Sequence, residues 1–231
     1  MQGKLIVIEG TDCSGKETQT KLLIEKLKEQ NIKTANFSFP NYDSPTGKIV
    51  GGPYLGKDYI CPSYFEQGAA NVDPKVASLY YAADRKYNID KITFLLENGV
   101  NVILDRYIYS NMAHQGGKVY EKKKREEMYS FLEKLEFELL ELPKPDIAIF
   151  LHMPTDKAQI LKQNRKEKPD GHEKDIDHLK NAEKAYIELA LRYNMHIIEC
   201  ANESIRSIED INNDVYNCVI NNIENTKNKS L

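Results

Sequence analysis

Residues 4–18 read KLIVIEGTDCSGKET, and they join three kinds of local sequence. Lys4 to Glu9 is an apolar run rich in Ile and Val, and it is short enough for a buried strand rather than a helix. A turn bounded by Gly10 and Gly15 follows. From Lys16 to Gln30, leucines recur at helical spacing amid lysines and glutamates. The stretch therefore predicts a buried strand, a tight glycine loop and an amphipathic helix in direct succession.

The glycine loop nearly fits the phosphate-binding pattern G-x-x-x-x-G-K-[ST]. Its glycines let the backbone fold tightly around an anion, which then meets several amide N–H groups and the positive end of the helix dipole. Lys16 adds a full positive charge for the terminal phosphates. An ordinary glycine turn is the alternative, but the flanking strand and helix favour nucleotide binding. The predicted ATP-binding residues are Gly10, Thr11, Asp12, Cys13, Ser14, Gly15, Lys16, Glu17 and Thr18.

One position departs from this pattern. Glu17 follows Lys16 where a magnesium-binding hydroxyl is expected, and Thr18 comes one place later. A carboxylate suits the first turn of a helix but would repel phosphate, so we expect Glu17 to point away from the phosphates. The candidate Mg²⁺ ligands are Asp12 in the loop and Asp105 at the end of a later strand. Two acids are enough because Mg²⁺ keeps phosphate oxygens and water as ligands. Asp105 could alternatively cap a following helix.

Apolar strands and helical stretches alternate along the rest of the chain, which favours a mainly parallel α/β sheet with helices on both faces. The expected strands are 4–9, 35–39, 101–105, 146–152 and 196–200, and the expected helices are 16–30, 76–98, 121–142, 155–166, 176–193 and 205–223. Residues 1–223 are thus expected to form one domain on a five-stranded sheet, followed by a polar, frayed tail over 224–231. Residues 41–73 show little periodicity, and a loop of this length in a compact domain is usually functional or mobile.

The composition excludes several classes of protein. The chain of 231 residues has 32 basic and 35 acidic residues, so it does not carry the bulk positive charge of a protein that coats nucleic acid. The four cysteines form no CxxC pair, which argues against a structural zinc site and a disulfide framework. No apolar run approaches the roughly 18 residues of a membrane span, and no signal peptide is evident. We expect a cytoplasmic protein without a nucleic-acid or membrane partner.

Further motifs occur in a fixed order along the chain. The longest is DRYIYSNMAHQGG at 105–117; FPNY at 39–42 and LYYAADR at 79–85 precede it. LPKPD at 142–146 and the charged segment 165–175 follow it. Together with the glycine loop, these motifs resemble those of the thymidylate kinase family of P-loop nucleoside monophosphate kinases. The resemblance covers roughly residues 1–220, and five matches in order are far more specific than one.

The resemblance implies phosphoryl transfer from MgATP to dTMP, giving dTDP and ADP, in dTTP biosynthesis. Lys16 and Asp12 match the loop residues of the family, and Arg106 matches the arginine at the acceptor phosphate. Tyr81 stands where the family usually has a phenylalanine that stacks on thymine. The substrate-binding residues implied in this way are Phe39, Pro40, Tyr42, Tyr81, Arg85, Arg106, Asn111, Gln115 and Glu173. Because relatives are commonly homodimers, a homodimer is implied as well.

The chemistry of this reaction places its own demands on the site. The acceptor is already a phosphate oxyanion, so fixed cations and exclusion of water matter more than a general base. Lys16, Arg106 and Arg165 are the predicted cations, and Asp12 completes the predicted catalytic set. Residues 163–175 are predicted to form a mobile lid over ATP, with a solvated loop as the alternative. The family carries a transition-state arginine either in the glycine loop or in the lid. Because this glycine loop has no arginine, the resemblance implies that Arg165 of the lid has this role, helped by Lys166 or Lys168.

Other readings of these residues stay open at this point. Tyr81 could be an ordinary core tyrosine of a helix, and Arg85 could be solvated or paired with Asp84. The same scaffold could serve another nucleoside or nucleotide as acceptor. A nucleotide-dependent switch or ATPase is the more distant alternative, although the N-K-x-D motif of guanine-binding switches is absent.

Overall fold

The computed structural model describes residues 2–162 and 175–228, and its described strands form one parallel sheet. The strand order is β2-β3-β1-β4-β5, and each neighbouring pair is parallel. The strands are β1 (Leu5–Gly10), β2 (Thr34–Ser38), β3 (Asn101–Asp105), β4 (Ile147–His152) and β5 (His196–Glu199). The α/β class and all five expected strands are confirmed, and the sheet is parallel throughout.

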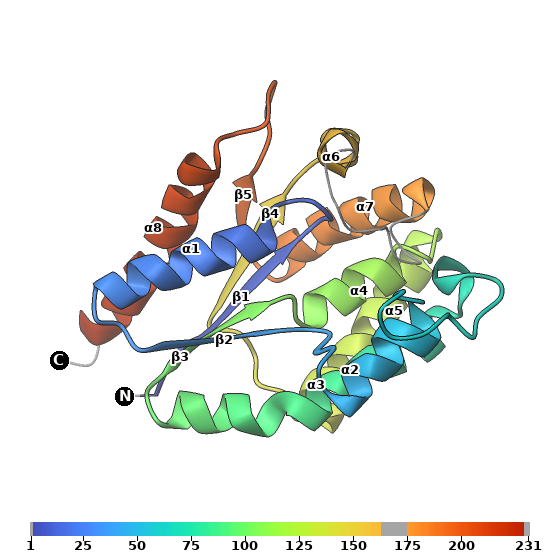
Figure 1. The fold of residues 1–231 in the computed structure, drawn as a ribbon, viewed down its shortest axis with the longest axis horizontal. Coiled ribbons are helices and arrows are strands. Elements are labelled where there is room, and N and C mark those ends of the chain that lie inside the picture. Colours follow the sequence, from blue (N-terminus) through green and yellow to red (C-terminus); the bar gives the residue numbers. More distant parts are fainter. Residues whose placement is uncertain (1, 163–174, 229–231) are drawn as a thin grey trace.

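Helices cover both faces of this sheet (Figure 1). They are α1 (Lys16–Glu29), α2 (Pro45–Ile49), α3 (Pro74–Glu97), α4 (Ile108–Gly116), α5 (Lys122–Glu133), α6 (Thr155–Lys162), α7 (Ile176–Arg192) and α8 (Ile208–Asn228). Helices α1 and α8 pack on one face, and α3, α4, α5 and α7 pack on the other. Alternate residues of β1 serve the two cores: Ile6 and Ile8 face α1 and α8, whereas Leu5 and Val7 face the opposite layer.

The strand order brings the glycine loop to the place where ligands gather in such sheets. Strand β1 lies between β3 and β4, so its carboxyl end opens at the point where the order of the strands reverses. In open parallel sheets, ligands bind outside the carboxyl ends of the strands at this switch point. The loop after β1 and the residues that end β3 therefore meet at one edge.

Three parts of the chain differ from the expectation. The irregular stretch 41–73 contains α2, a π-helical turn at Val50–Tyr54 and a 3₁₀ turn at Ala69–Asn71. The stretch that follows β3 forms α4, which we did not expect as a helix. Helix α8 continues to Asn228, so part of the expected frayed tail is helical. It runs one turn past its last buried apolar residue, Ile223.

The helix expected over 121–142 also changes character partway. It is α-helical to Glu133 and then π-helical over Lys134–Leu139. None of the helices in the two described ranges is both long and apolar enough to cross a membrane.

Candidate active site

The glycine loop between β1 and α1 turns sharply at the carboxyl edge of the sheet (Figure 1). Gly10 has to be glycine, because a Cβ atom there would lie 2.7 Å from the carbonyl oxygen of Leu151. Gly15 has a φ of 79°, a left-handed conformation that glycine adopts readily. The hydroxyl of Thr11 donates to the carbonyl of Met153 at 2.7 Å, just beyond β4. The loop is therefore held against its neighbouring strand.

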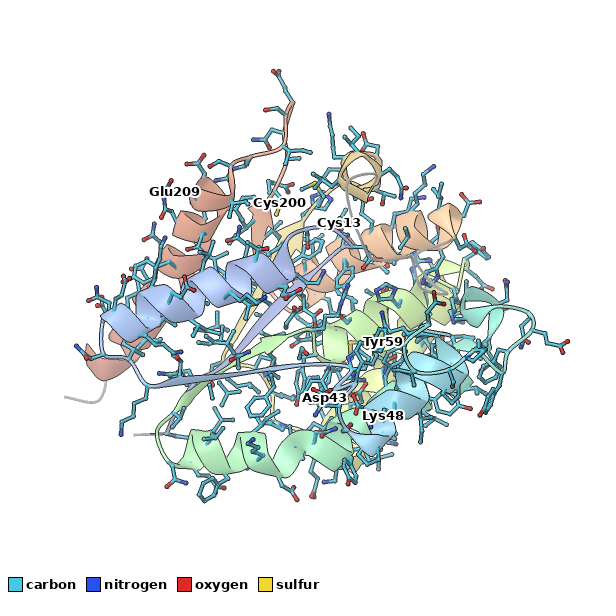
Figure 2. All side chains as sticks on the ribbon, in the orientation of Figure 1. Cys13, Asp43, Lys48, Tyr59, Cys200 and Glu209 are labelled. Carbon is cyan, nitrogen blue, oxygen red and sulfur yellow. The ribbon has the colours of Figure 1, made fainter. Side chains whose placement is uncertain are left out.

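A cavity of about 610 Å³ opens at this loop, and we call it the cleft. Its walls come from the glycine loop, the ends of β2 and β3, helices α3 and α4, and residues 55–59. Six of the nine predicted ATP-binding residues line it, namely Asp12, Cys13, Gly15, Lys16, Glu17 and Thr18. Figure 2 labels Cys13 within this loop. The other three, Gly10, Thr11 and Ser14, lie behind them as support.

Lys16 is buried at the start of α1, and its ammonium rests on the loop. Its Nζ donates to the carbonyl oxygens of Gly10 at 3.1 Å and Thr11 at 2.8 Å. Burial, together with the positive charge of Arg106, lowers the pKa of Lys16 to about 8. Glu17 does not share this environment, since it pairs with Lys21 at 2.6 Å on the exposed side of the helix. Glu17 nevertheless borders the cleft, so its orientation away from bound phosphates stays a prediction.

Arg106 enters the cleft from the end of β3. Its φ of 66° is uncommon for a residue other than glycine. Its Nη2 donates to Asp12 at 2.7 Å, and its Nη1 donates to the carbonyl of Gly10 and the hydroxyl of Tyr186, both at 3.2 Å. A guanidinium held from several segments presents a fixed positive charge to the cleft.

Glu9, the residue before the loop, links the end of β1 to the start of α4. It is fully buried, and it accepts hydrogen bonds from the backbone amides of Tyr107 at 2.9 Å and Ser110 at 3.1 Å. Burial raises the pKa of its carboxyl despite these bonds. Because Tyr107 is the N-cap residue of α4 and Ser110 lies in its first turn, Glu9 caps that helix from strand β1. We did not identify Glu9 from the sequence, although a carboxylate inside an apolar strand was a usable signal.

The opposite half of the cleft is aromatic. Phe39, Pro40, Tyr42 and Tyr81 all line it, as the family resemblance implied. Phe39 is buried and packs on Tyr107 with ring centroids 6.1 Å apart. Tyr81 is half-buried rather than enclosed in the core, and its ring makes an edge-to-face contact with the ring of Tyr54, with centroids 5.8 Å apart. These four side chains therefore share one cleft with the glycine loop.

Arg85 also reaches the cleft lining, but its charge is compensated. It is 2% exposed and forms a two-pronged ion pair with Glu136. Glu136 is fully buried in the π-helical turn after α5 and also accepts from Asn111 at 2.9 Å. The suggested pairing of Arg85 with Asp84 is wrong, because Asp84 instead accepts from residues of the α2 region. Sequence spacing could not reveal Glu136 as the partner, because 51 residues separate it from Arg85.

Gln115 is not part of the cleft lining formed by the described residues. It is completely buried, whereas Asn111 and His114 of the same helix line the cleft. Asn111 and His114 are three positions apart, so they lie on the side of α4 that borders the cleft, whereas Gln115 lies on the side that packs into the protein. Arg165 and Glu173, with nearly all of the predicted lid at 163–175, lie outside the described residues.

The two aspartates predicted for Mg²⁺ differ in their surroundings. Asp105 lines the cleft, and its negative charge partly offsets the lowering of the pKa of nearby Lys16 by burial and by Arg106. It does not cap α4: the N-cap residue of that helix is Tyr107, and the amides of Tyr107 and Ser110 donate to Glu9 instead. Asp12 also lines the cleft but is paired with Arg106. No group of three metal-ligating side chains occurs within the described residues. The donor set fits a hard cation that relies on phosphate oxygens and water.

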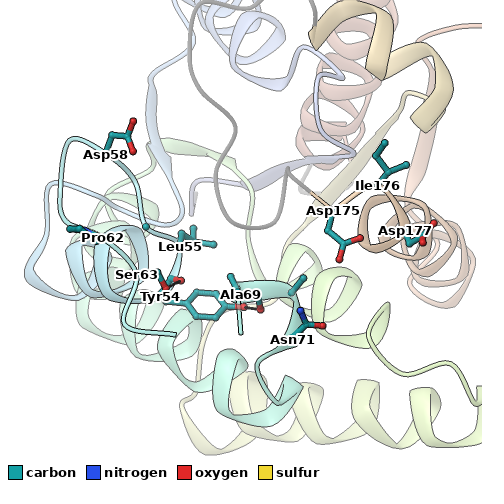
Figure 3. Close-up of a pocket in the computed structure, with 13 residues that line it drawn as sticks. Tyr54, Leu55, Asp58, Pro62, Ser63, Ala69, Asn71, Asp175, Ile176 and Asp177 are labelled. Carbon is teal, nitrogen blue, oxygen red and sulfur yellow. Dashed lines mark hydrogen bonds between the residues drawn. The ribbon is translucent and has the colours of Figure 1, made fainter. Parts of the chain in front are cut away.

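A second, larger hollow of about 1030 Å³ lies between residues 54–71 and the start of α7 (Figure 3). Its lining includes Asp58, Asp175 and Asp177, and no lysine or arginine of the described chain contributes to it. Asp175 is engaged there as the cap of α7, accepting from the amide of His178 at 2.9 Å. Such a wall would repel phosphate, so the phosphate chemistry belongs to the first cleft.

The parallel sheet, the glycine loop and a cleft with cations facing an aromatic half define a P-loop kinase of nucleotide-sized acceptors. Comparison with known proteins agrees with this class. The family model for thymidylate kinase matches residues 8–213. The chain therefore belongs to the thymidylate kinase family, and it is a nucleoside monophosphate kinase.

Individual relatives cover nearly the whole chain. The thymidylate kinase of Plasmodium falciparum is 31% identical over 93% of this chain and 88% of that protein. The thymidylate kinase of Schizosaccharomyces pombe is 30% identical over 95% of this chain and 93% of that protein. The solved structure of thymidylate kinase from Candida albicans superposes with a TM-score of 0.72 at 24% identity. It covers 96% of this chain and 92% of that one, which shows the shared fold.

Proposed function

We propose that this chain transfers the terminal phosphoryl group of MgATP to the phosphate of dTMP, giving dTDP and ADP on the route to dTTP. The observation that carries the proposal is a single cleft in which Lys16 and Arg106 face an aromatic half that contains Tyr81. A donor triphosphate seated on the glycine loop would meet the acceptor phosphate near Arg106. Family membership supports the same reaction.

The residues of the cleft supply charge and position rather than acid–base chemistry. The acceptor phosphate is mostly deprotonated at neutral pH, so its oxygen can attack without a general base. Lys16 and Arg106 hold the two phosphate groups and stabilise the charge that develops between them. Bound with ATP, Mg²⁺ would neutralise further phosphate charge, and Asp105 and Asp12 would hold it mainly through water. The predicted transition-state cation, Arg165, stays a prediction.

The aromatic half suits a pyrimidine. Tyr81 offers a flat face for stacking, and Phe39 closes the wall beside it. The Oδ1 oxygen of Asn111 is buried and has no hydrogen-bond partner among the described residues. Such an acceptor is suited to the imide N–H of thymine, because a buried polar atom is costly unless it is paired. The paired Arg85 and Glu136 hold Asn111 in place from behind.

An acceptor panel tests this proposal directly. We expect MgATP to support steady formation of ADP with dTMP, with a higher kcat/KM than with dUMP, dGMP or AMP. Turnover should stop when Mg²⁺ is chelated. A higher kcat/KM with a purine nucleotide would show that the preferred acceptor is not dTMP. Absence of steady turnover with all four nucleotides would favour a nucleotide-dependent switch.

We also propose that the protein is a homodimer formed through α3. Apolar side chains recur at helical spacing along its outer side: Val76, Leu79, Ala83, Tyr87 and Phe94. Tyr87 and Phe94 are 60% and 63% exposed. Exposed apolar side chains gathered on one face favour a protein partner, and a second copy is the partner that relatives imply. The cytoplasmic location stays a prediction.

A further inference from the structure

Glu136 is a buried carboxylate that lies behind the lining of the cleft. It belongs to the π-helical turn Lys134–Leu139, in which Lys134 and Glu138 on either side of it are exposed. Glu136 itself is completely buried, and it contacts side chains of α3 and α4. Short π-helical turns often occur at functional sites. This turn carries a single acidic side chain inward, to residues that border the cleft.

Two residues of the cleft lining share the carboxylate of Glu136. Arg85 of α3 donates to it with two guanidinium nitrogens, and its Nη2 lies 2.7 Å from Oε1. Asn111 of α4 donates its Nδ2 to the same Oε1 at 2.9 Å. A carboxylate held by a guanidinium in this way stays ionised, and an ionised carboxylate only accepts hydrogen bonds. Glu136 is therefore a fixed acceptor for both side chains.

The surroundings of Asn111 fix the orientation of its side-chain amide. Nδ2 carries two hydrogens, and two acceptors receive them: Oε1 of Glu136 at 2.9 Å and the carbonyl oxygen of Ser78 at 3.2 Å. Neither of these can donate, so a reversed amide would place oxygen against oxygen. Oδ1 is buried and has no hydrogen-bond partner within the described parts of the chain. The atom that Asn111 has left for a ligand is thus an acceptor.

An acceptor at this place distinguishes bases by the hydrogen on one ring nitrogen. Thymine and uracil carry a hydrogen on N3, which can be donated to Oδ1 of Asn111. Cytosine has a lone pair on N3 instead. Two acceptors that face each other in a closed site are both left unpaired, and this costs binding energy.

We propose that Glu136 determines base specificity by fixing the amide of Asn111, so that the site takes a base with a hydrogen on N3 and rejects cytosine. This inference rests on the proposed function. Glu136 acts through Asn111, so it is a positioning residue rather than a ligand of the nucleotide. An amide in place of its carboxylate would supply a donor for Oδ1. The amide of Asn111 could then reverse and present Nδ2 to the base.

The test compares dTMP with 5-methyl-dCMP, which has the same methyl group, sugar and phosphate but an amino group on C4 and no hydrogen on N3. For the wild type, we expect kcat/KM to be about 100-fold or more higher with dTMP. Glu136→Gln should lower this ratio by about 10-fold or more, the scale of a hydrogen bond at a buried site. In the Asn111→Ala background, Glu136→Gln should change the ratio by less than about twofold, because its route to the base is gone.

Glu138→Gln is the matched control, because Glu138 is an exposed glutamate of the same turn, and its ratio should equal that of the wild type. Thermal unfolding shows whether each variant is folded. Glu136→Gln leaves the buried Arg85 without an opposite charge. Glu136→Asp is therefore the second variant: it keeps the charge, its shorter side chain withdraws from Asn111, and its ratio should fall too. If Glu136→Gln does not fold, Glu136→Asp decides the question.

An unchanged ratio in the folded variant, or an equal fall in the Asn111→Ala background, would overturn the proposal. Wild-type turnover separates this result from the proposed function. If the wild type prefers dUMP or dGMP, the proposed acceptor is wrong, and the same comparison is made between that nucleotide and dCMP or dAMP. A wild type that prefers 5-methyl-dCMP or AMP, whose corresponding ring nitrogen has no hydrogen, would overturn both.

Discussion

Arg106 illustrates how single residues acquire their function from distant partners. Its positive φ directs the chain after β3 into the cleft, and its guanidinium is shared between Asp12 of the glycine loop and Tyr186 of α7. Beneath it, Glu9 holds the first turn of α4. A positive charge is thus fixed in place in the cleft before a nucleotide binds, and a fixed charge of this kind is the condition for electrostatic catalysis.

This arrangement predicts a graded response to substitution of Arg106. Arg106→Ala should lower kcat/KM for dTMP by about 100-fold or more, the scale of a lost contact to a transferring phosphate. Arg106→Lys should recover only part of this loss, because a lysine cannot reproduce the planar fork that engages several acceptors. Steady-state kinetics measure both values. Arg192→Ala, which removes an arginine of α7 remote from the cleft, is the control. Near-normal turnover in Arg106→Ala would remove Arg106 from the reaction.

At the scale of elements, His152 joins three of them. It ends β4, and its two ring nitrogens lie 3.0 Å from Glu183 of α7 and 2.7 Å from Glu199 of β5. Glu183 also accepts from the amide of Thr155, the first residue of α6, at 2.9 Å. The helix that leads from the cleft into residues 163–174 is therefore anchored through a histidine that can carry a proton.

The hydrogen bond to Glu183, followed by the bond and charge of Glu199, raises the pKa of His152 above its ordinary value of 6.5. A group whose pKa rises on folding stabilises the protein fully below its unfolded pKa, and this contribution is lost as pH rises through the folded value. His152→Gln should therefore lower the free energy of unfolding most at about pH 6 and least at about pH 9.

Urea denaturation across this range measures the difference between variant and wild type. His196→Gln, at an exposed histidine of β5, is the matched control and is measured across the same range. A deficit in His152→Gln that is the same at every pH would mean that His152 contributes packing alone.

Some helices and strands could be predicted from the sequence, and others could not. All five strands could be predicted, but only β1, β3 and β4 are apolar runs that the parallel sheet largely buries, whereas β2 and β5 are edge strands with mostly exposed or half-buried residues. Helix α4 could not, because its first amides are capped by Glu9 rather than by a neighbour in sequence. The aromatic residues of the cleft were implied by the family resemblance, whereas the partner of Arg85 depends on the packing of an irregular segment.

At the scale of the whole molecule, the long helix α3 connects the cleft with the outer surface. Its inner side carries Tyr81 and Arg85 in the cleft lining, and its outer side carries the exposed apolar stripe from Val76 to Phe94. A partner that packs on the outer side would therefore also steady the helix that carries these two cleft residues. Association and substrate binding would then share one element.

The dimer proposal predicts that Phe94→Glu converts the protein to a monomer. Phe94 is well exposed, so a glutamate there is compatible with folding of the single chain but would place a charge inside an apolar interface. Light scattering after size-exclusion chromatography should give twice the mass of one chain for the wild type and the mass of one chain for the variant. Leu191→Glu, at a 74% exposed leucine of α7, should leave the dimer intact. A monomeric wild type would refute the dimer, and a Phe94→Glu variant that stays dimeric would place the interface on another face. If α3 couples the two properties, the KM for dTMP should also rise in Phe94→Glu and stay unchanged in Leu191→Glu.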